Sequence, residues 1–69
     1  MPTLKELRLE ARLSLTQLAR LADVDRQTVD RAENGEPVRD FKASAIAQAL
    51  ARQLNREIKL DEIEGLNIL

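Results

Sequence analysis

The chain has 69 residues, with 11 Lys and Arg against 12 Asp and Glu, no His, no Cys and one aromatic side chain, Phe41. This length predicts a single domain over residues 1–69, which buries only ~60% of the surface that its unfolded form exposes. No disulfide and no His or Cys zinc site can stabilise it, so the core must be aliphatic, and 12 Leu, 9 Ala, 4 Ile and 3 Val are available. Leu and Ala favour helices and β-branched residues are few, so the composition predicts an all-α fold.

The same composition excludes several classes of function. His-based catalysis, thiol chemistry and a soft metal site need residues that the chain lacks, and two Gly are too few for a Gly-rich phosphate loop. We therefore expect no enzyme, no cofactor and no metal site. No apolar run approaches the ~18 residues of a membrane span, and no charged and apolar leader opens the chain. We expect a cytoplasmic protein that does not engage a membrane.

Two capping boxes predict where the first two helices begin. In such a box, a Ser or Thr hydroxyl accepts from the backbone amide three residues ahead, and a Glu or Gln side chain reaches back to the Ser or Thr amide. Residues 3–6 (TLKE) predict a helix over residues 4–12, and residues 14–17 (SLTQ) predict a second helix over residues 15–22. In both segments apolar residues recur at the spacing of one helix face.

A third helix is predicted over residues 26–33. Asp25 precedes it as an N-cap that supplies an acceptor oxygen for its free amides. Asn34 and Gly35 follow it, and Gly tolerates the left-handed conformation that helix ends commonly require. Pro37 prevents the helix from resuming.

The rest of the chain predicts a fourth helix over residues 41–54, capped by Asp40, and a short helical turn over residues 60–64. Residues 3–56 form the expected body of the domain and carry ten basic and eight acidic side chains. The tail, residues 57–69, carries one basic and four acidic side chains and several apolar ones.

The second and third predicted helices are too short to hold each other at a fixed angle, so particular residues must set that angle. Ala19 is small where the helices approach closely, Asp23 tolerates a left-handed turn, and Val29 is apolar on the inner face of the third helix. Small, turn-compatible and β-branched residues at this spacing are what a DNA-binding helix-turn-helix requires sterically.

Residues 13–35 (LSLTQLARLADVDRQTVDRAENG) resemble the helix-turn-helix of the Cro/CI-like family of transcriptional regulators, also called XRE or lambda-repressor-like. The resemblance includes the helices over residues 7–12 and 45–50, and covers residues 3 to about 63. It implies a lambda-repressor-like compact bundle of about five short helices, with the helix-turn-helix at the second and third. Such proteins bind duplex DNA, most often as dimers on pseudo-palindromic operators.

Two positions depart from the pattern of this family. Leu15 stands where the family commonly has a Gln whose amide touches a phosphate, and Thr16 and Gln17 are the candidates to replace that contact. Asp23 stands where the family usually has Gly, and Asp adopts the left-handed conformation better than most residues.

The resemblance places the third helix in the major groove, with its outward side chains facing the base edges. The candidates for base contacts are Arg26, Gln27, Thr28 and Arg31, because Arg pairs with guanine and Gln with adenine through two hydrogen bonds. Asp30 fits best as a residue that orients Arg26 or Arg31. Phosphate contacts are expected from polar residues at helix N-termini and in the following loop: Thr16, Gln17, Arg20, Asn34, Arg39 and Lys42.

The charge balance and the tail allow more than one interpretation. A protein that neutralises phosphates is expected to be basic, whereas this chain has a net charge of −1. If the tail is directed away from the DNA, the remaining residues, 3–56, have a charge of +2. The apolar residues of the tail either fold back to complete the core or form a homodimer interface: Ile63, Leu66, Ile68 and Leu69.

These features predict a sequence-specific, double-stranded DNA-binding transcriptional regulator, a repressor that acts by occupancy in the cytoplasm and associates with the nucleoid. The alternative is a protein-interaction module, antitoxin-like or an adaptor, that retains the fold with little DNA binding. Arg26, Gln27 and Arg31 favour DNA, whereas four acidic residues favour the alternative: Asp23, Asp25, Asp30 and Glu33.

Overall fold

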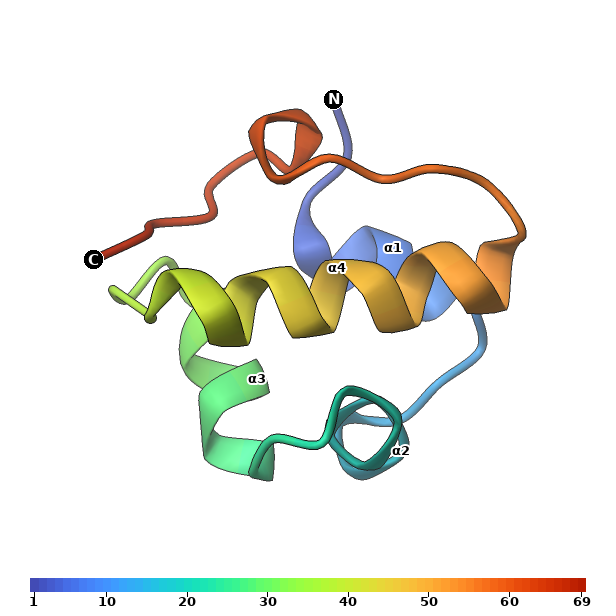
Figure 1. Ribbon diagram of the computed structural model, residues 1–69, viewed down its shortest axis with the longest axis horizontal. Helices are drawn as coiled ribbons and strands as arrows, with labels where there is room; N and C mark the ends of the chain where they lie inside the picture. Colours follow the sequence, from blue (N-terminus) through green and yellow to red (C-terminus); the bar gives the residue numbers. More distant parts are fainter.

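The computed structural model describes residues 1–69 and is all-helical (Figure 1). Its elements are α1 (Leu4–Glu10), α2 (Leu15–Ala22), α3 (Arg26–Glu33), α4 (Asp40–Leu54) and a 3-10 turn, η1 (Leu60–Glu62). The fold therefore has four α-helices rather than about five, because the tail after α4 forms only a single 3-10 turn. None of the helices combines the length and the apolar character that crossing a membrane requires.

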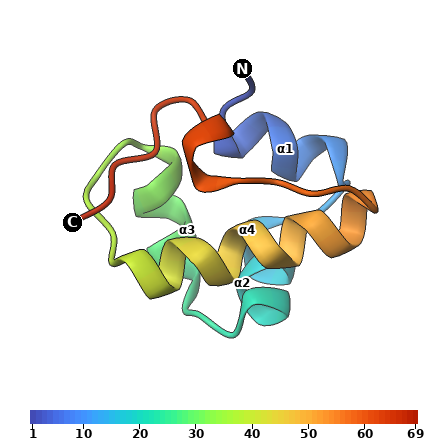
Figure 2. The ribbon, with the colours of Figure 1, turned by 45° about the horizontal axis from the view of Figure 1, so that its top comes forward.

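The longest helix, α4, lies across the middle of the molecule, with α1 on one side and the α2–α3 pair on the other (Figure 1). The tail runs back over α1 and α4 and ends near the start of α4 (Figures 1 and 2). The α2–α3 pair is thereby left uncovered on the side of the molecule away from the tail.

Both predicted capping boxes are formed, which confirms the starts of α1 and α2. The Thr3 amide donates to Glu6 Oε1 at 2.8 Å, and the Glu6 amide donates to Thr3 Oγ1 at 3.2 Å. The Ser14 amide donates to Gln17 Oε1 at 2.9 Å, and the Gln17 amide donates to Ser14 Oγ at 3.1 Å. The backbone bond from Thr3 is also the main reason why the pKa of Glu6 lies below its usual value. Each box satisfies amides that a helix N-terminus otherwise leaves free.

Two helix ends differ from the prediction. α1 ends at Glu10, two residues early, and Arg12 then adopts a left-handed conformation with φ 59°, which turns the chain toward α2. Asp40 is the first residue of α4 rather than its cap. Arg39 occupies the cap position instead, because its backbone is extended and its carbonyl accepts the first hydrogen bonds of the helix.

One cluster of 14 buried aliphatic residues forms the core, which confirms the expectation from composition. At its centre lie side chains of all four α-helices that are at most 1% exposed: Leu7, Leu18, Val29, Ile46 and Leu50. Small residues of α4 are also buried and let the other helices approach closely: Ala43, Ala47 and Ala49. The single aromatic side chain, Phe41, lies outside this core.

The four apolar residues of the tail do not share one environment. Ile63 is buried in the core, and Leu66 packs partly buried against it. Ile68 and Leu69 remain 39% and 80% exposed. The tail therefore completes the core with its first apolar residues and leaves the last two at the surface.

An ion pair with little exposure to solvent joins α1 to the end of α3. Arg8 Nε lies 2.5 Å from Glu33 Oε2, and Arg8 Nη2 donates to Glu33 Oε1 at 3.3 Å. Arg8 Nη1 donates to the Leu13 carbonyl at 3.0 Å. The two charged side chains are only 11% and 8% exposed. One arginine thus connects α1, the α1–α2 connection and the C-terminal end of α3.

We expect Glu33→Gln to lower the free energy of unfolding by ~3 kcal/mol, because breaking a buried pair leaves the Arg8 charge without its counter-charge. Urea unfolding followed by circular dichroism measures this loss. The Arg56–Glu10 pair, whose side chains are 48% and 50% exposed, provides the matched control. Glu10→Gln should cost much less, since water screens an exposed pair. Equal losses in the two variants would contradict the structural importance of the buried pair.

Candidate nucleic-acid interface

Helices α2 and α3 are joined by a tight turn with the conformation predicted for it. Asp23 has φ 58° and ψ 43°, which confirms that it is left-handed. The Asp23 amide donates to the Arg20 carbonyl at 3.2 Å, and the Val24 amide donates to the Ala19 carbonyl at 3.0 Å. These bonds satisfy carbonyl groups at the C-terminal end of α2.

Small and β-branched residues set the angle between α2 and α3. Ala19 and Val29 are both buried, so the inner faces of the two helices meet without a long side chain between them. Val24 in the turn is partly buried against the same core. This packing leaves the opposite face of α3 toward solvent (Figure 1).

The outward face of α3 carries three polar side chains with no ionic partner. Arg26, Gln27 and Arg31 are all exposed. Every ion pair of the protein lies elsewhere, so neither arginine is neutralised by a carboxylate. Guanidinium and carboxamide groups in this state are free to donate hydrogen bonds to a ligand, and Gln27 is also free to accept them.

Thr28 is placed differently from the other predicted base-contacting residues. It is 8% exposed, and its hydroxyl donates to Asp25 Oδ1. Asp25 occupies the cap position of α3 but bonds this hydroxyl instead of a backbone amide, which corrects the predicted capping. The bond from Thr28 is the main reason why the pKa of Asp25 lies below its usual value. The geometry favours a role for this pair in ordering the start of α3.

The inward position of Thr28 could have been foreseen from helix periodicity. It lies next to Val29 and one helical turn before Ala32, and both of these residues are buried. The resemblance to a recognition helix favoured a DNA contact for Thr28, whereas the position of Thr28 along α3 places it on the inner edge of the helix.

Two acidic residues that favoured a protein-interaction module are engaged within the fold. Glu33 is in the ion pair with Arg8, so it does not belong to the exposed face of α3. Asp25 accepts the hydrogen bond from Thr28. Only Glu33 is neutralised by a cation, whereas Asp25 is exposed and its lowered pKa favours the charged form, so it still contributes to the acidic character of the surface near α3.

Asp30 remains exposed on α3, but it does not orient an arginine. Its Oδ1 lies 3.5 Å from Nδ2 of Asn34, the residue that follows the helix. Asp30 forms no ion pair with Arg26 or Arg31, so the structure does not confirm that it orients either arginine.

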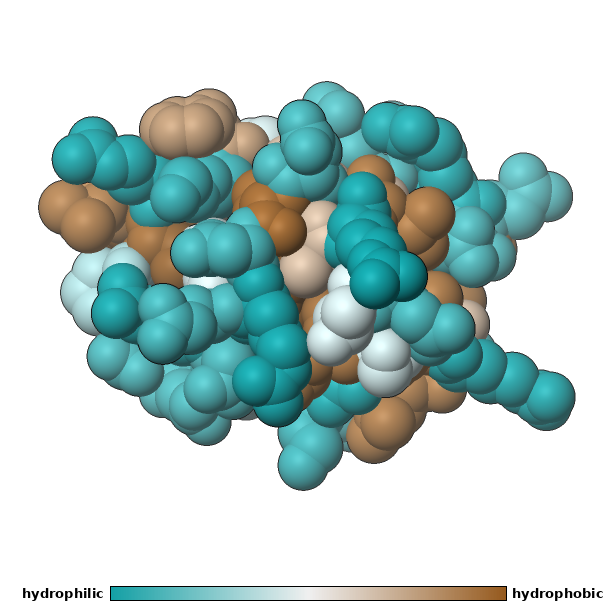
Figure 3. All heavy atoms as spheres, turned by 90° about the horizontal axis from the view of Figure 1, so that it is seen from below, coloured by the Kyte–Doolittle hydropathy of each residue, from teal (hydrophilic) through white to brown (hydrophobic).

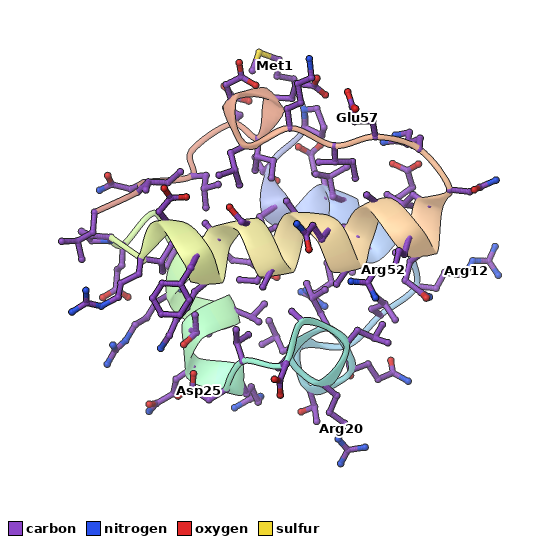
Figure 4. The ribbon with its side chains drawn as sticks, viewed as in Figure 1. Met1, Arg12, Arg20, Asp25, Arg52 and Glu57 are labelled. Atoms are coloured by element: carbon purple, nitrogen blue, oxygen red, sulfur yellow. The ribbon has the colours of Figure 1, made fainter.

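The N-terminus of α2 brings free backbone donors next to polar side chains. The amides of Leu15 and Thr16 have no partner within the protein. Thr16 and Gln17 are exposed, and the capping box uses the Gln17 carboxamide oxygen while leaving its NH2 group as a donor. Arg20 projects outward on the same side of the molecule as Asp25 (Figure 4). An anion would find donors here.

At the other end of α3, basic side chains surround a hollow of about 170 Å³. Arg31, Arg39 and Lys42 line this hollow, and Leu69 of the tail also lines it. Arg39 and Lys42, two predicted phosphate contacts at the start of α4, thus lie near Arg31, a predicted base contact on α3.

The first part of the tail, with η1, lies on the side of the molecule away from α3 (Figure 1), whereas Leu69 at its end reaches the hollow beside Arg31. Glu57 projects from the top of Figure 4, whereas Arg20 and Asp25 lie at the bottom. Seen from the α2–α3 side, the surface is mainly hydrophilic, with hydrophobic side chains in separate small groups (Figure 3). The tail has a net charge of −3 and residues 3–56 have +2, but residues 15–42, which contain α2, α3 and the start of α4, carry five basic and six acidic side chains. The side with α3 therefore offers individual basic side chains rather than a net basic excess.

A family model described as helix-turn-helix matches residues 4–58 of the chain, from the first residue of α1 to just beyond α4. The matched segment contains α2, the turn at Asp23 and α3, and it leaves out most of the tail. No curated protein and no solved structure matches the chain.

The left-handed turn residue gives a test of the turn. We expect Asp23→Gly to keep or slightly raise the free energy of unfolding, because Gly adopts positive φ without strain. Asp23→Val should lower it by about 1–2 kcal/mol, because a branched side chain is strained in this conformation. Urea unfolding of both variants measures the difference. Equal stabilities would be inconsistent with a left-handed residue 23.

Asp25 makes part of the stability depend on pH. Its pKa is lowered by folding, so its contribution is complete above the usual value of 3.8 and is lost as the pH falls through the lower folded value. The Asp25→Asn variant has no titratable group at this position, so it lacks the part of the acid-induced loss of stability that Asp25 causes. Thermal unfolding of both proteins from neutral pH to about pH 2 should therefore show a stability difference that shrinks in acid. A difference that stays constant with pH would contradict the assignment.

Proposed function

This chain belongs to the helix-turn-helix family of Cro/CI-like DNA-binding regulators, and on that premise we propose that it is a repressor that occupies a specific operator in duplex DNA. In this proposal α2 and α3 are the helix-turn-helix, and α3 is the recognition helix that enters the major groove. The observation that carries the proposal is the outward face of α3, where Arg26, Gln27 and Arg31 are exposed together without ionic partners.

Each of these three side chains can distinguish one base from the others. Arg26 and Arg31 each have the two donors that pair with O6 and N7 of guanine, and Gln27 has the donor and acceptor that pair with N7 and N6 of adenine. A contact of this kind disfavours a wrong base by ~1–3 kcal/mol. Thr28 is left out of the base-contacting set, because its hydroxyl is bound to Asp25.

Phosphate contacts on both sides of α3 would fix its position in the groove. On one side, the free amides of Leu15 and Thr16 support an anion contact at the start of α2. On the other side, the basic hollow after α3 supports a second. The side chains assigned to phosphates are Thr16, Gln17, Arg20, Asn34, Arg39 and Lys42.

We also infer that two copies act together on a pseudo-palindromic operator. One helix-turn-helix contacts few base pairs, and a second copy one helical turn away, ~34 Å, adds specificity. Ile63 and Leu66 pack against the core of their own chain, so the interface residues in this proposal are Ile68 and Leu69.

The second candidate is a protein-interaction module that retains the fold. Asp30 supports it, because an exposed carboxylate on the outward face of α3 is repelled by phosphates. Phe41 also supports it, since this side chain is 67% exposed and lines a hollow beside the α2–α3 turn.

Selection from a pool of random duplex DNA at two salt concentrations, followed by sequencing, separates these proposals. We expect enrichment of a pseudo-palindrome whose half-sites lie ~34 Å apart. Enrichment of a single half-site would support operator binding but contradict the dimer. Failure to enrich any sequence at either salt concentration would contradict operator recognition and favour the protein-interaction module.

Base contacts and phosphate contacts differ in the mutational effects expected of them. Arg26→Ala should relax specificity at one base pair, at a cost of ~1–3 kcal/mol for the preferred sequence. Lys42→Ala should weaken binding to all sequences about equally and reduce the salt slope by about 0.9. Lys59→Ala removes a cation from the tail and serves as the control, with little expected effect. Identical behaviour of the first two variants on every sequence would show that α3 is not the recognition helix.

A further inference from the structure

Residues 66–69 hold the loop between α3 and α4 by backbone hydrogen bonds, and we call this segment the C-terminal clasp. The Val38 amide donates to the Asn67 carbonyl at 3.0 Å, and the Leu69 amide donates to the Val38 carbonyl at 2.8 Å. Asn67 Nδ2 also lies 3.5 Å from the Gly35 carbonyl oxygen. The clasp lies outside the residues 4–58 that match the helix-turn-helix family.

The backbone of the loop has few other hydrogen bonds near Val38, whose side chain is buried in the core. The amides of residues 35 and 36 bond back to α3, and Pro37 has no amide to donate. Among residues 37–39, Val38 is the only one whose amide is bonded within the protein, and its partner is in the clasp. The core therefore holds the side chain of Val38, and the clasp holds its backbone where the loop enters α4.

Two glycine turns form a second contact between the tail and this loop. Gly35 and Gly65 both have φ 79°, a conformation that residues with a side chain rarely adopt. A Cβ on Gly35 would lie 3.6 Å from the Gly65 carbonyl oxygen, which shows how closely the two turns approach. The tail thus already runs close to the loop at the residue before the clasp.

Arg39 is the residue most directly affected by this arrangement. It follows Val38 and occupies the cap position of α4, so the clasp fixes the backbone from which its side chain extends. That side chain forms no ion pair and lines the basic hollow, of which Leu69 is another wall. Lys42 lines the same hollow, but the helix itself fixes its backbone.

We propose that the C-terminal clasp positions Arg39 to bind a phosphate of the DNA backbone. The proposal rests on the proposed function, because it requires that DNA contacts the α3–α4 loop. A side chain whose backbone is already ordered loses less freedom on binding, and its contact is correspondingly stronger. In this proposal the clasp orders the backbone at Arg39 and makes no contact with a base itself.

A matched pair of substitutions tests the clasp. Leu69→Pro removes the amide that donates to Val38, whereas Leu69→Ala keeps that amide and also removes most of the side chain. Titration of a fluorescent duplex of fixed sequence at several salt concentrations measures both affinity and salt slope. We expect Leu69→Pro to weaken binding several-fold on any sequence and to lower the slope by about 0.9, which corresponds to one phosphate contact. Leu69→Ala lacks the same leucine side chain, which the proposed dimer interface uses, so any loss that the two variants share is assigned to that side chain. We expect the further loss of affinity and the lower salt slope in Leu69→Pro alone.

The same substitution in two further backgrounds shows whether the clasp acts through Arg39. Relative to Leu69→Ala, Leu69→Pro should have no additional effect on Arg39→Ala and its full effect on Lys42→Ala. If circular dichroism shows that Leu69→Pro is unfolded, Asn67→Ala provides a milder test, because it removes the side-chain bond to Gly35 and keeps both backbone bonds to Val38. We then expect a smaller loss of binding that is again absent in the Arg39→Ala background.

Three results would overturn the proposal. Equal binding by the wild type and the clasp variants would show that the clasp does not affect DNA binding. An equal loss in the Arg39→Ala and Lys42→Ala backgrounds would show that the clasp acts on the domain as a whole. Absence of binding by the wild type at any salt concentration would overturn the proposed function together with this proposal, and is therefore distinguishable from the first two.

Discussion

The arrangement of this protein depends on the ion pair between Arg8 and Glu33. A helix of eight residues is not stable alone, and α3 has no side-chain hydrogen bond capping its first amides. Packing of Val29 fixes the middle of α3, and Arg8 holds its C-terminal end through Glu33. Because the same guanidinium also binds the Leu13 carbonyl, it sets the chain just before α2 begins. The residues of α1 therefore determine the orientation of the exposed face of α3 without contributing to that face.

Local chemistry made part of this fold predictable from the sequence. The capping boxes at Thr3 and Ser14 and the left-handed residues Asp23 and Gly35 depend only on near neighbours in the chain, and all four are found as expected. The bounds of α2 and α3 also agree with the prediction. The helix-turn-helix family follows from the same stretch of sequence, since the residues that set the turn are also those that characterise the motif.

Contacts between distant segments were not predictable in the same way. Glu33 looks like one more acidic residue of α3 because its partner lies 25 residues earlier in the chain. The tail was open to two interpretations, since apolar residues near an end of the chain serve a core or an interface equally well, and here they divide between core and surface. Thr28 is different, because its spacing from Ala32 already indicated the inner side of α3. Which side chains contact bases and which contact phosphates stays a prediction, since it depends on the angle at which a second molecule docks.

The charge distribution also affects how the protein approaches a polyanion. Residues 15–42, which contain α2, α3 and the start of α4, carry five basic and six acidic side chains, and the tail adds a net charge of −3. Long-range attraction therefore contributes little to the rate at which this protein meets a DNA duplex. Within a Debye length, ~8 Å at physiological ionic strength, single side chains such as Arg26 and Arg31 act on the nearest phosphates. Attraction thus begins only when α3 already lies close to the DNA, so most encounters in other orientations end without binding.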